Sequence, residues 1–160
     1  TPLEVYCLHG YKPDSDILEL LIQHGADPEY YSRTSPLESL LVHHQFDDDS
    51  EAVLKDAIFL LDNGASFVVQ KGHYQGDNPL HLACSSWGTP VLLKGLLEKY
   101  PGAVNTQNKD GDTPLTLAAF SDNKKCIVLL LEYGADESIV NYSGHTARDI
   151  ETMQKKDQVK

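Results

Sequence analysis

The stretch GDTPLTLAAF, residues 111–120, begins with polar turn residues and continues into an apolar helical pattern. Nearly the same phrase occurs earlier as GDNPLHLACS at residues 76–85. Two weaker copies are TSPLESLLVH at residues 34–43 and TPLEVYCLHG at residues 1–10. One capping position recurs in these copies and in the final GHTARD, at spacings of 34, 43, 35 and 33 residues: Thr1, Ser35, Asn78, Thr113 and Thr146. Periods in this range indicate stacked supersecondary units.

The residues of one copy explain why the unit is a pair of helices. Thr113 carries a side-chain oxygen that caps a helix, and Pro114 suits the first helical turn because that turn needs no backbone N–H. A second, more apolar helix is predicted over residues 126–132, and Gly134 ends it in a left-handed conformation. Neither helix is long enough to be stable alone in water. Each unit therefore needs its neighbours, which explains the repetition.

Composition narrows the classes of function. A net charge of −11 over 160 residues argues against nucleic acid and anionic membranes as partners, because phosphate binding needs clustered Lys and Arg. Three widely spaced cysteines in apolar patterns, Cys7, Cys84 and Cys126, indicate buried reduced thiols and a cytosolic location. No signal peptide or membrane-spanning run is visible. Because the chain opens on Thr1 without Met, we expect a processed product or an excised fragment.

These paired phrases resemble the ankyrin-repeat family, whose Thr-Pro-Leu-His and Leu-Leu-x-x-Gly-Ala-Asp motifs are matched by TPLT, NPLH, LLEYGAD and LIQHGAD. The resemblance covers nearly the whole chain. It implies an all-α solenoid of stacked helix-turn-helix units with projecting β-hairpin loops. We expect a single domain, residues 1–160, with repeats at about 1–34, 35–77, 78–112 and 113–145 and a partial capping repeat at 146–160.

The chain departs from the family pattern in three places. The motif histidine is kept only as His81, and Glu4, Glu38 and Thr116 replace it, so the resemblance predicts its hydrogen bonds for one unit and not for the other three. The second unit is about ten residues longer than the family norm, and we place most of the insertion within residues 43–56, between the paired helices. The absence of a hairpin before Thr1 predicts that further repeats or another domain preceded it.

The resemblance also implies a binding face, formed by the hairpin tips and the first helices on the concave side. Exposed aromatic residues are favoured anchors there, because they bury a large area at small entropic cost. An alternative is that Trp87 or Phe120 folds back over the neighbouring helices. The residues that we expect to bind a partner are Tyr31, Tyr74, Asp77, Trp87, Lys109, Asp110, Asp112, Phe120, Tyr142 and His145.

Other candidate sites have plainer interpretations. The acidic run FDDDSE, residues 46–51, lacks the ligand spacing of a calcium loop, and Asp48 with Glu51 instead indicates a capping box for a helix at residues 52–61. His43 and His44 point in different directions on one helix, so a pH-sensitive contact is favoured over a metal site. We expect no cofactor and no catalytic residue. Asn105 occupies the position of a hydroxylated asparagine in some ankyrin arrays, but a hairpin-bracing role is favoured.

Three functions remain open at this point. We expect a monomeric, non-catalytic protein–protein interaction module or scaffold that binds a basic or extended segment of another protein on its concave face. The alternative is the recognition arm of a larger enzyme or pathogen effector, in which case the location would be the host cytosol. In a third possibility the array only caps or spaces other domains.

Overall fold

The computed structural model describes residues 2–8, 14–29, 34–43, 50–70, 74, 76–84 and 89–157, with only the backbone of Leu8, His43 and Asp157. Within these residues the chain is helical and contains no strand. The α-helices are α1 (Pro2–Leu8), α2 (Ser15–Gln23), α3 (Pro36–His43), α4 (Ser50–Asp62), α5 (Pro79–Cys84), α6 (Pro90–Lys99), α7 (Pro114–Phe120), α8 (Lys124–Glu132) and α9 (Ala147–Asp157), and the 3-10 helix η2 is Pro101–Ala103.

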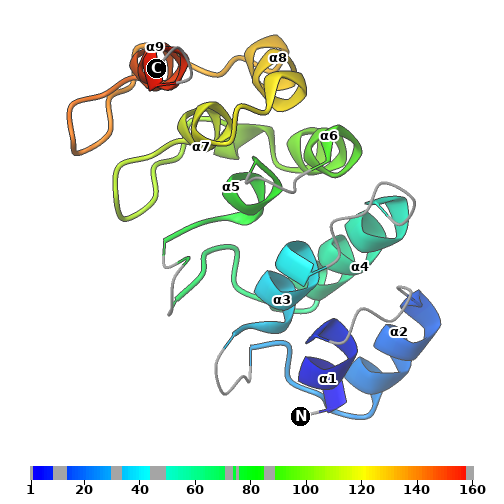
Figure 1. Ribbon diagram of the computed structural model, residues 1–160. Coiled ribbons are helices and arrows are strands. Elements are labelled where there is room, and N and C mark those ends of the chain that lie inside the picture. Colours follow the sequence, from blue (N-terminus) through cyan, green and yellow to red (C-terminus); the bar gives the residue numbers. More distant parts are fainter. Residues whose placement is uncertain are drawn as a thin grey trace.

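The helices form a two-layered stack that runs from one end of the molecule to the other (Figure 1). In one layer α1, α3, α5, α7 and α9 contact one another in sequence, and in the other layer α2, α4, α6 and α8 do the same. Each helix inside the stack therefore packs on the unit before and the unit after it, as expected of a quasi-one-dimensional repeat array. The prediction of an all-α repeat solenoid is confirmed.

The first helices begin where the repeated phrase predicts. The Thr113 hydroxyl accepts a hydrogen bond from the Thr116 N–H at 3.2 Å, and Ser35 accepts one from the Glu38 N–H at 3.1 Å. Asn78 uses its amide oxygen in the same way for two backbone N–H groups at the start of α5. Thr146 caps α9 through the Asp149 N–H. A side-chain oxygen at this position satisfies N–H groups that the helix itself leaves without acceptors.

The second helices end in two different ways. Gly25, Gly64 and Gly134 have φ values of +84°, +100° and +85°, the left-handed conformation predicted for a helix-terminating glycine. After α6, by contrast, Tyr100 closes the helix and the chain makes the short helix η2. The third unit therefore turns through Pro101 and Gly102 without a left-handed glycine.

The core is made mainly of leucine from both layers, and all six residues of α5 are buried. Cys7, Cys84 and Cys126 have no exposed surface, which confirms the expected burial of the thiols. Burial raises the pKa of the Cys7 thiol to about 12 and also raises the pKa of Cys84 above its ordinary value, so both stay as unreactive thiols at neutral pH.

The long second unit has its extra residues between and within its paired helices. From capping residue to terminal glycine this unit spans 29 residues, against 21 in the fourth unit. Helix α4 has 13 residues where α8 has 9, and α3 has 8 where α7 has 7. The connection between α3 and α4 contributes the remaining three. Helix α4 begins at Ser50, two residues before the predicted start, and the proposed cap Asp48 lies outside the described residues.

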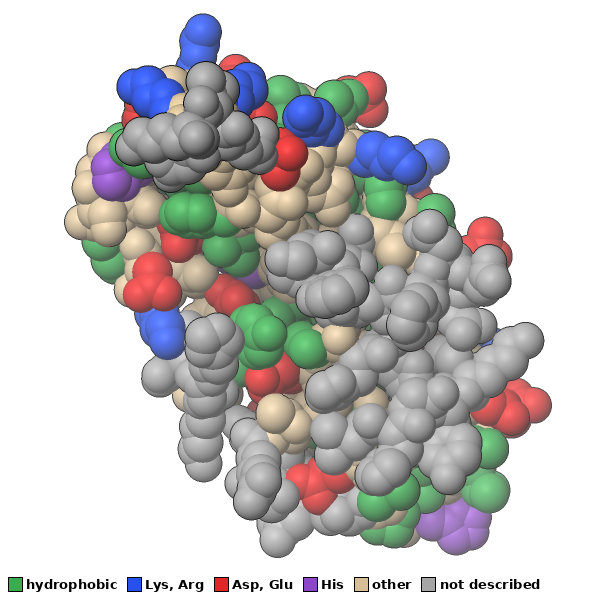
Figure 2. All heavy atoms as spheres, viewed as in Figure 1, with side chains coloured by type: hydrophobic (Ala, Val, Ile, Leu, Met, Phe, Trp, Pro, Cys, Tyr) green, Lys and Arg blue, Asp and Glu red, His purple; other side chains and the backbone are tan. Residues whose placement is uncertain are grey.

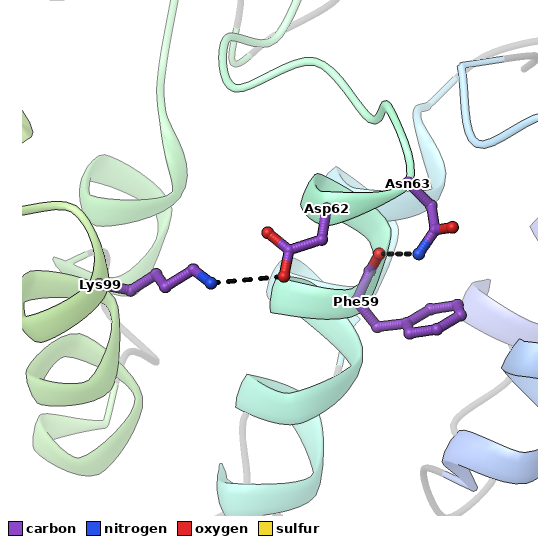
Figure 3. A network of polar contacts seen from close by, with 4 residues as sticks. All are labelled: Phe59, Asp62, Asn63 and Lys99. Carbon is purple, nitrogen blue, oxygen red and sulfur yellow. Dashed lines mark hydrogen bonds and ion pairs between the residues drawn. The ribbon is translucent and has the colours of Figure 1, made fainter.

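Polar contacts on the outer layer add little to this packing. Lys99 of α6 lies 3.3 Å from the Asp62 carboxylate at the end of α4, and the Asn63 amide donates to the Phe59 carbonyl at 2.8 Å (Figure 3). Both partners of the ion pair are about half exposed, and such pairs contribute at most about 1 kcal/mol. In the described part of the chain, no helix has the length and apolar character needed to cross a membrane.

Candidate protein-binding face

The loops that join successive units project from one side of the stack as short hairpins, which we call fingers (Figure 1). In the third finger, residues 108–112, the Asn108 N–H donates to the Asp112 carbonyl at 2.9 Å. The fourth finger, residues 141–145, repeats this bond between Asn141 and His145, also at 2.9 Å. The second finger, residues 69–77, has it between Val69 and Asp77 at 2.8 Å. The three fingers therefore share one hydrogen-bonded base, although no described residue in them is a β-strand.

A row of amide and carboxylate side chains binds each finger to the next. The Asn108 amide donates to the Asp77 carboxylate at 2.7 Å, and the Asn141 amide donates to Asp112 at 2.9 Å. The amide oxygen of Asn108 meanwhile accepts from the N–H groups of Asp110 and Asp112 in its own finger. One side chain thus shapes a finger and attaches it to its neighbour.

This row corrects the sequence prediction for two residues. Asp77 and Asp112 were expected on the exposed surface, but they are only 6% and 8% exposed, because each is enclosed between two fingers. The two asparagines that hold them, Asn108 and Asn141, were missed. They recur 33 residues apart and four residues before the end of a finger, so the repeat alignment already contains this signal.

Burial changes the acidity of these carboxyl groups. It raises the pKa of Asp77 to about 6, although the hydrogen bond from Asn108 acts in the opposite direction. Burial also raises the pKa of Asp112 above its ordinary value, again opposed by its asparagine. A desolvated carboxylate favours its neutral form, so the finger bases are sensitive to pH below neutrality.

His81 connects the start of α5 to the third finger. Its Nδ1 accepts from the Asn78 N–H at 3.2 Å, and its Nε2 lies 2.9 Å from the Asp112 carbonyl. These two partners assign the neutral tautomer with the proton on Nε2. Burial lowers the pKa of His81 to about 4. In the next unit Thr116 keeps the local bond, from the Thr113 N–H at 3.3 Å, and forms a capping box with Thr113.

Two aromatic residues of the predicted face are well exposed. Tyr142, on the fourth finger, is 77% exposed, and Phe120, at the end of α7, is 49% exposed. The Tyr142 ring lies over Gly111, where an added Cβ would be 2.7 Å from a ring carbon. The Tyr142 N–H also donates to the Asp110 carbonyl at 3.0 Å. Tyr142 is therefore an exposed aromatic residue on a fixed backbone.

The other predicted residues divide into three groups. Lys109 and Asp110 are exposed on the third finger, and Lys109 covers Gly76 as Tyr142 covers Gly111. Tyr74 and His145 are partly buried, and Tyr74 packs against the core, so it offers less surface than expected. Tyr31 and Trp87 lie outside the described residues, as does His44.

Asn105 has the bracing role that was favoured for it. Its amide donates to the Gly134 carbonyl at 3.2 Å, and its oxygen accepts from the Asp136 N–H at 2.8 Å. These bonds join the third unit to the turn after α8. Among the described residues, no group of three or more His, Cys, Asp or Glu side chains is placed to hold a metal ion.

Comparison with known proteins agrees with this architecture. A family profile described as "Ankyrin repeats (3 copies)" matches residues 14–141. The putative ankyrin repeat protein R96 of Acanthamoeba polyphaga mimivirus is 32% identical over 131 residues, which is 82% of this chain and 12% of that protein. The BCL-6 corepressor-like protein 1 of Homo sapiens is 42% identical over 72 residues, or 45% of this chain and 4% of that protein.

A third similar protein is shorter. The probable 26S proteasome regulatory subunit p28 of Saccharomyces cerevisiae (strain ATCC 204508 / S288c) is 39% identical over 93 residues, or 58% of this chain and 40% of that protein. The chain thus spans less than half the length of each of these three relatives. The profile match, the recurring caps and the stacked helix pairs together place this chain in the ankyrin-repeat family.

Proposed function

We propose that this chain is a non-catalytic module that holds a partner protein on the face made by its fingers and first helices, with Tyr142 and Phe120 as anchors. Ankyrin repeats generally serve in protein–protein interaction and are generally not catalytic. The observation that carries the proposal is the exposure of Tyr142, at 77%, on a finger whose backbone is fixed by its neighbour. A large aromatic ring that is already held in place loses little entropy when it is buried by a partner.

The buried acids have a supporting role in this proposal. Asp77 and Asp112 hold the fingers in register through Asn108 and Asn141, so they shape the face without touching the partner. The charged contacts then come from the exposed residues Lys109 and Asp110, with His145 beside Tyr142 on the fourth finger.

Charge distribution favours a basic partner segment. The chain carries a net charge of −11. Among the described residues on the face shown in Figure 2, Asp and Glu occur along the length of the stack, whereas Lys and Arg gather mainly toward its C-terminal end, over α6, α8 and α9. A basic segment would be attracted to this surface, and the attraction would speed association and weaken as salt is added.

The test is affinity capture with two matched variants. Phe120→Ala with Tyr142→Ala removes both proposed anchors, and Val91→Ala with Val128→Ala removes two exposed side chains of comparable exposure from the outer helices α6 and α8. The proposal predicts that the first pair loses at least about 30-fold in affinity for a captured partner, since two anchors are removed. The second pair should bind as the wild type does. If the outer-helix pair loses binding and the aromatic pair keeps it, the proposed face is wrong.

A further inference from the structure

A cleft separates the second and third fingers, although the third and fourth fingers are joined. In the latter pair the Gln107 amide donates to the Val140 carbonyl of the next unit at 3.0 Å and to the Gly111 carbonyl at 2.7 Å. Counting back from the hydrogen-bonded base of each finger, Val68 occupies the place of Gln107. Valine has no hydrogen-bond donor in its side chain, so this bridge cannot form between the second and third fingers.

A second contact between neighbouring units is missing at the same place. Asn105 joins the third unit to the next one, but Ser66, its counterpart in the second unit, bonds only within its own loop and to Glu29 before it. Among the described residues, no backbone hydrogen bond joins residues 67–70 to residues 106–109. The bases of the two fingers stay together through Asp77 and Asn108. The gap is therefore a cleft with a closed floor, not a break in the stack.

The cleft has a volume of about 520 Å3 and is lined by residues 67–70, Gly76, Asn78 and residues 106–109. Phe67 also lines a second, apolar hollow of about 430 Å3 together with Tyr100, Gly102 and Ala103. The Phe67 and Tyr100 rings lie 4.9 Å apart at 59°. Phe67 lines both hollows, and the apolar one lies beside the end of α6. Volumes of this size are typical of binding sites.

The chemistry of the lining selects an occupant. In the described part of the chain, the backbone N–H and C=O of Gln107 have no hydrogen-bond partner, and Gln107 lines the cleft together with Val68. Unpaired backbone groups beside an apolar hollow suit an extended peptide, which supplies main-chain hydrogen bonds and a side chain at once. We propose that this cleft binds an extended segment of a partner protein, with main-chain bonds to Gln107 and an aromatic or large aliphatic side chain against Phe67 and Tyr100.

The substitution that tests the site is Val68→Gln, which places before the second finger the amide donor that Gln107 supplies before the third. It should close the cleft without loss of stability, because it copies a contact that the fold already makes. The matched control is Val128→Gln, the same change at an exposed valine of α8. The probes are random octapeptides displayed on phage and selected against the wild-type chain, and then made as synthetic peptides.

The expected result is a peptide that perturbs the amide NMR signals of residues 66–70 and 100–109. Its affinity should fall at least tenfold with Val68→Gln and with N-methylation of the peptide residue that faces Gln107, and should stay unchanged with Val128→Gln. The inference is overturned if no peptide is selected, if the signals that move belong to Phe120 and Tyr142, or if Val68→Gln binds as well as the wild type. This site lies apart from the proposed anchors Phe120 and Tyr142. A negative result for the cleft would therefore not contradict the proposed function, and a negative result for the anchors would not contradict peptide binding in the cleft.

Discussion

At the scale of single residues, His81 and Thr116 occupy the same position in successive units but form different numbers of contacts. Both accept a hydrogen bond from the capping residue of their helix. Only the imidazole is long enough to reach the next finger, at the Asp112 carbonyl. His81 therefore couples the start of a helix to the adjacent binding loop, and Thr116 serves its own helix alone.

We predict that His81→Thr lowers the free energy of unfolding by about 2–3 kcal/mol, because it removes a buried hydrogen bond and leaves a small cavity. Thr116→Ser, which keeps the hydroxyl, should cost less than about 1 kcal/mol. Urea unfolding measures both. Equal costs for the two substitutions would show that the bond to the finger contributes nothing.

Asp77 gives a prediction about pH. Its pKa is raised to about 6 in the folded chain, so the folded state holds the proton more tightly than the unfolded state does. Its contribution to stability is complete below pH 4 and is lost as the pH rises through 6. The free energy of unfolding of Asp77→Asn, relative to that of the wild type, should therefore rise by up to about 3 kcal/mol as the pH goes from 4 to 7. Urea unfolding at each pH measures this difference. Parallel curves for the two proteins would contradict this assignment.

The same pH range contains an opposite effect from His81. Its pKa is lowered to about 4, so its contribution to stability is complete above its ordinary pKa of about 6.5 and is lost as the pH falls through 4. His81 contributes more to the free energy of unfolding at high pH, and Asp77 contributes more at low pH. The two effects therefore partly cancel in the wild type. The Asp77→Asn variant should accordingly lose stability more steeply than the wild type when it is acidified.

At the scale of elements, the fingers depend on two kinds of glycine. Gly134 ends α8 at φ +85° and has open space around it, whereas Gly111 has φ +78° and lies directly beneath Tyr142. An added Cβ at Gly111 would lie 2.7 Å from the Tyr142 backbone nitrogen. Gly134 is needed only for its left-handed backbone conformation, whereas Gly111 also allows the third and fourth fingers to pack closely.

We predict that Gly134→Ala lowers the free energy of unfolding by about 1 kcal/mol, the ordinary penalty for a non-glycine residue in the left-handed conformation. Gly111→Ala should cost at least about 2 kcal/mol, because the fourth finger must also move away. Thermal or urea unfolding compares the two. If both substitutions cost the same, the fingers are not packed as described.

The sequence predicts a residue's role when its partners are close in the chain, and not when they are distant. The caps Ser35, Asn78 and Thr113 act on N–H groups two or three residues away, so the repeated phrase was enough to identify them. The burial of Asp77 depends on an asparagine 31 residues further along the chain, and no local pattern reveals it. The long second unit shows the same contrast, since its length located the insertion but not the extra helical turn of α4.

At the scale of the whole molecule, stability should be local because each unit packs only on its neighbours. Leu18 in α2 and Leu130 in α8 are both fully buried, near opposite ends of the stack. Leu18→Ala should cost about 2–5 kcal/mol and speed hydrogen exchange mainly in α1 to α4, and Leu130→Ala should do so mainly in α6 to α9. Exchange that rises uniformly along the chain in either variant would mean that the array opens as one unit.

The array as a whole presents two surfaces that differ in chemistry. The finger face carries exposed aromatic rings among charged residues, and the cleft at Phe67 lies between the second and third fingers. The repeat pattern predicted the first surface, because it follows from the family's exposed positions. The second arises where one finger departs from its neighbours at Val68, and its importance becomes visible only when the fingers are compared in space.

The central claim is that a partner protein lies on the fingers and first helices, and hydrogen–deuterium exchange on a captured complex tests it most directly. We predict slower exchange at residues 108–112 and 141–145 and at the end of α7, with no change along the outer helices α6 and α8. Protection confined to α6 and α8, with the third and fourth fingers exchanging as in the free chain, would contradict the claim.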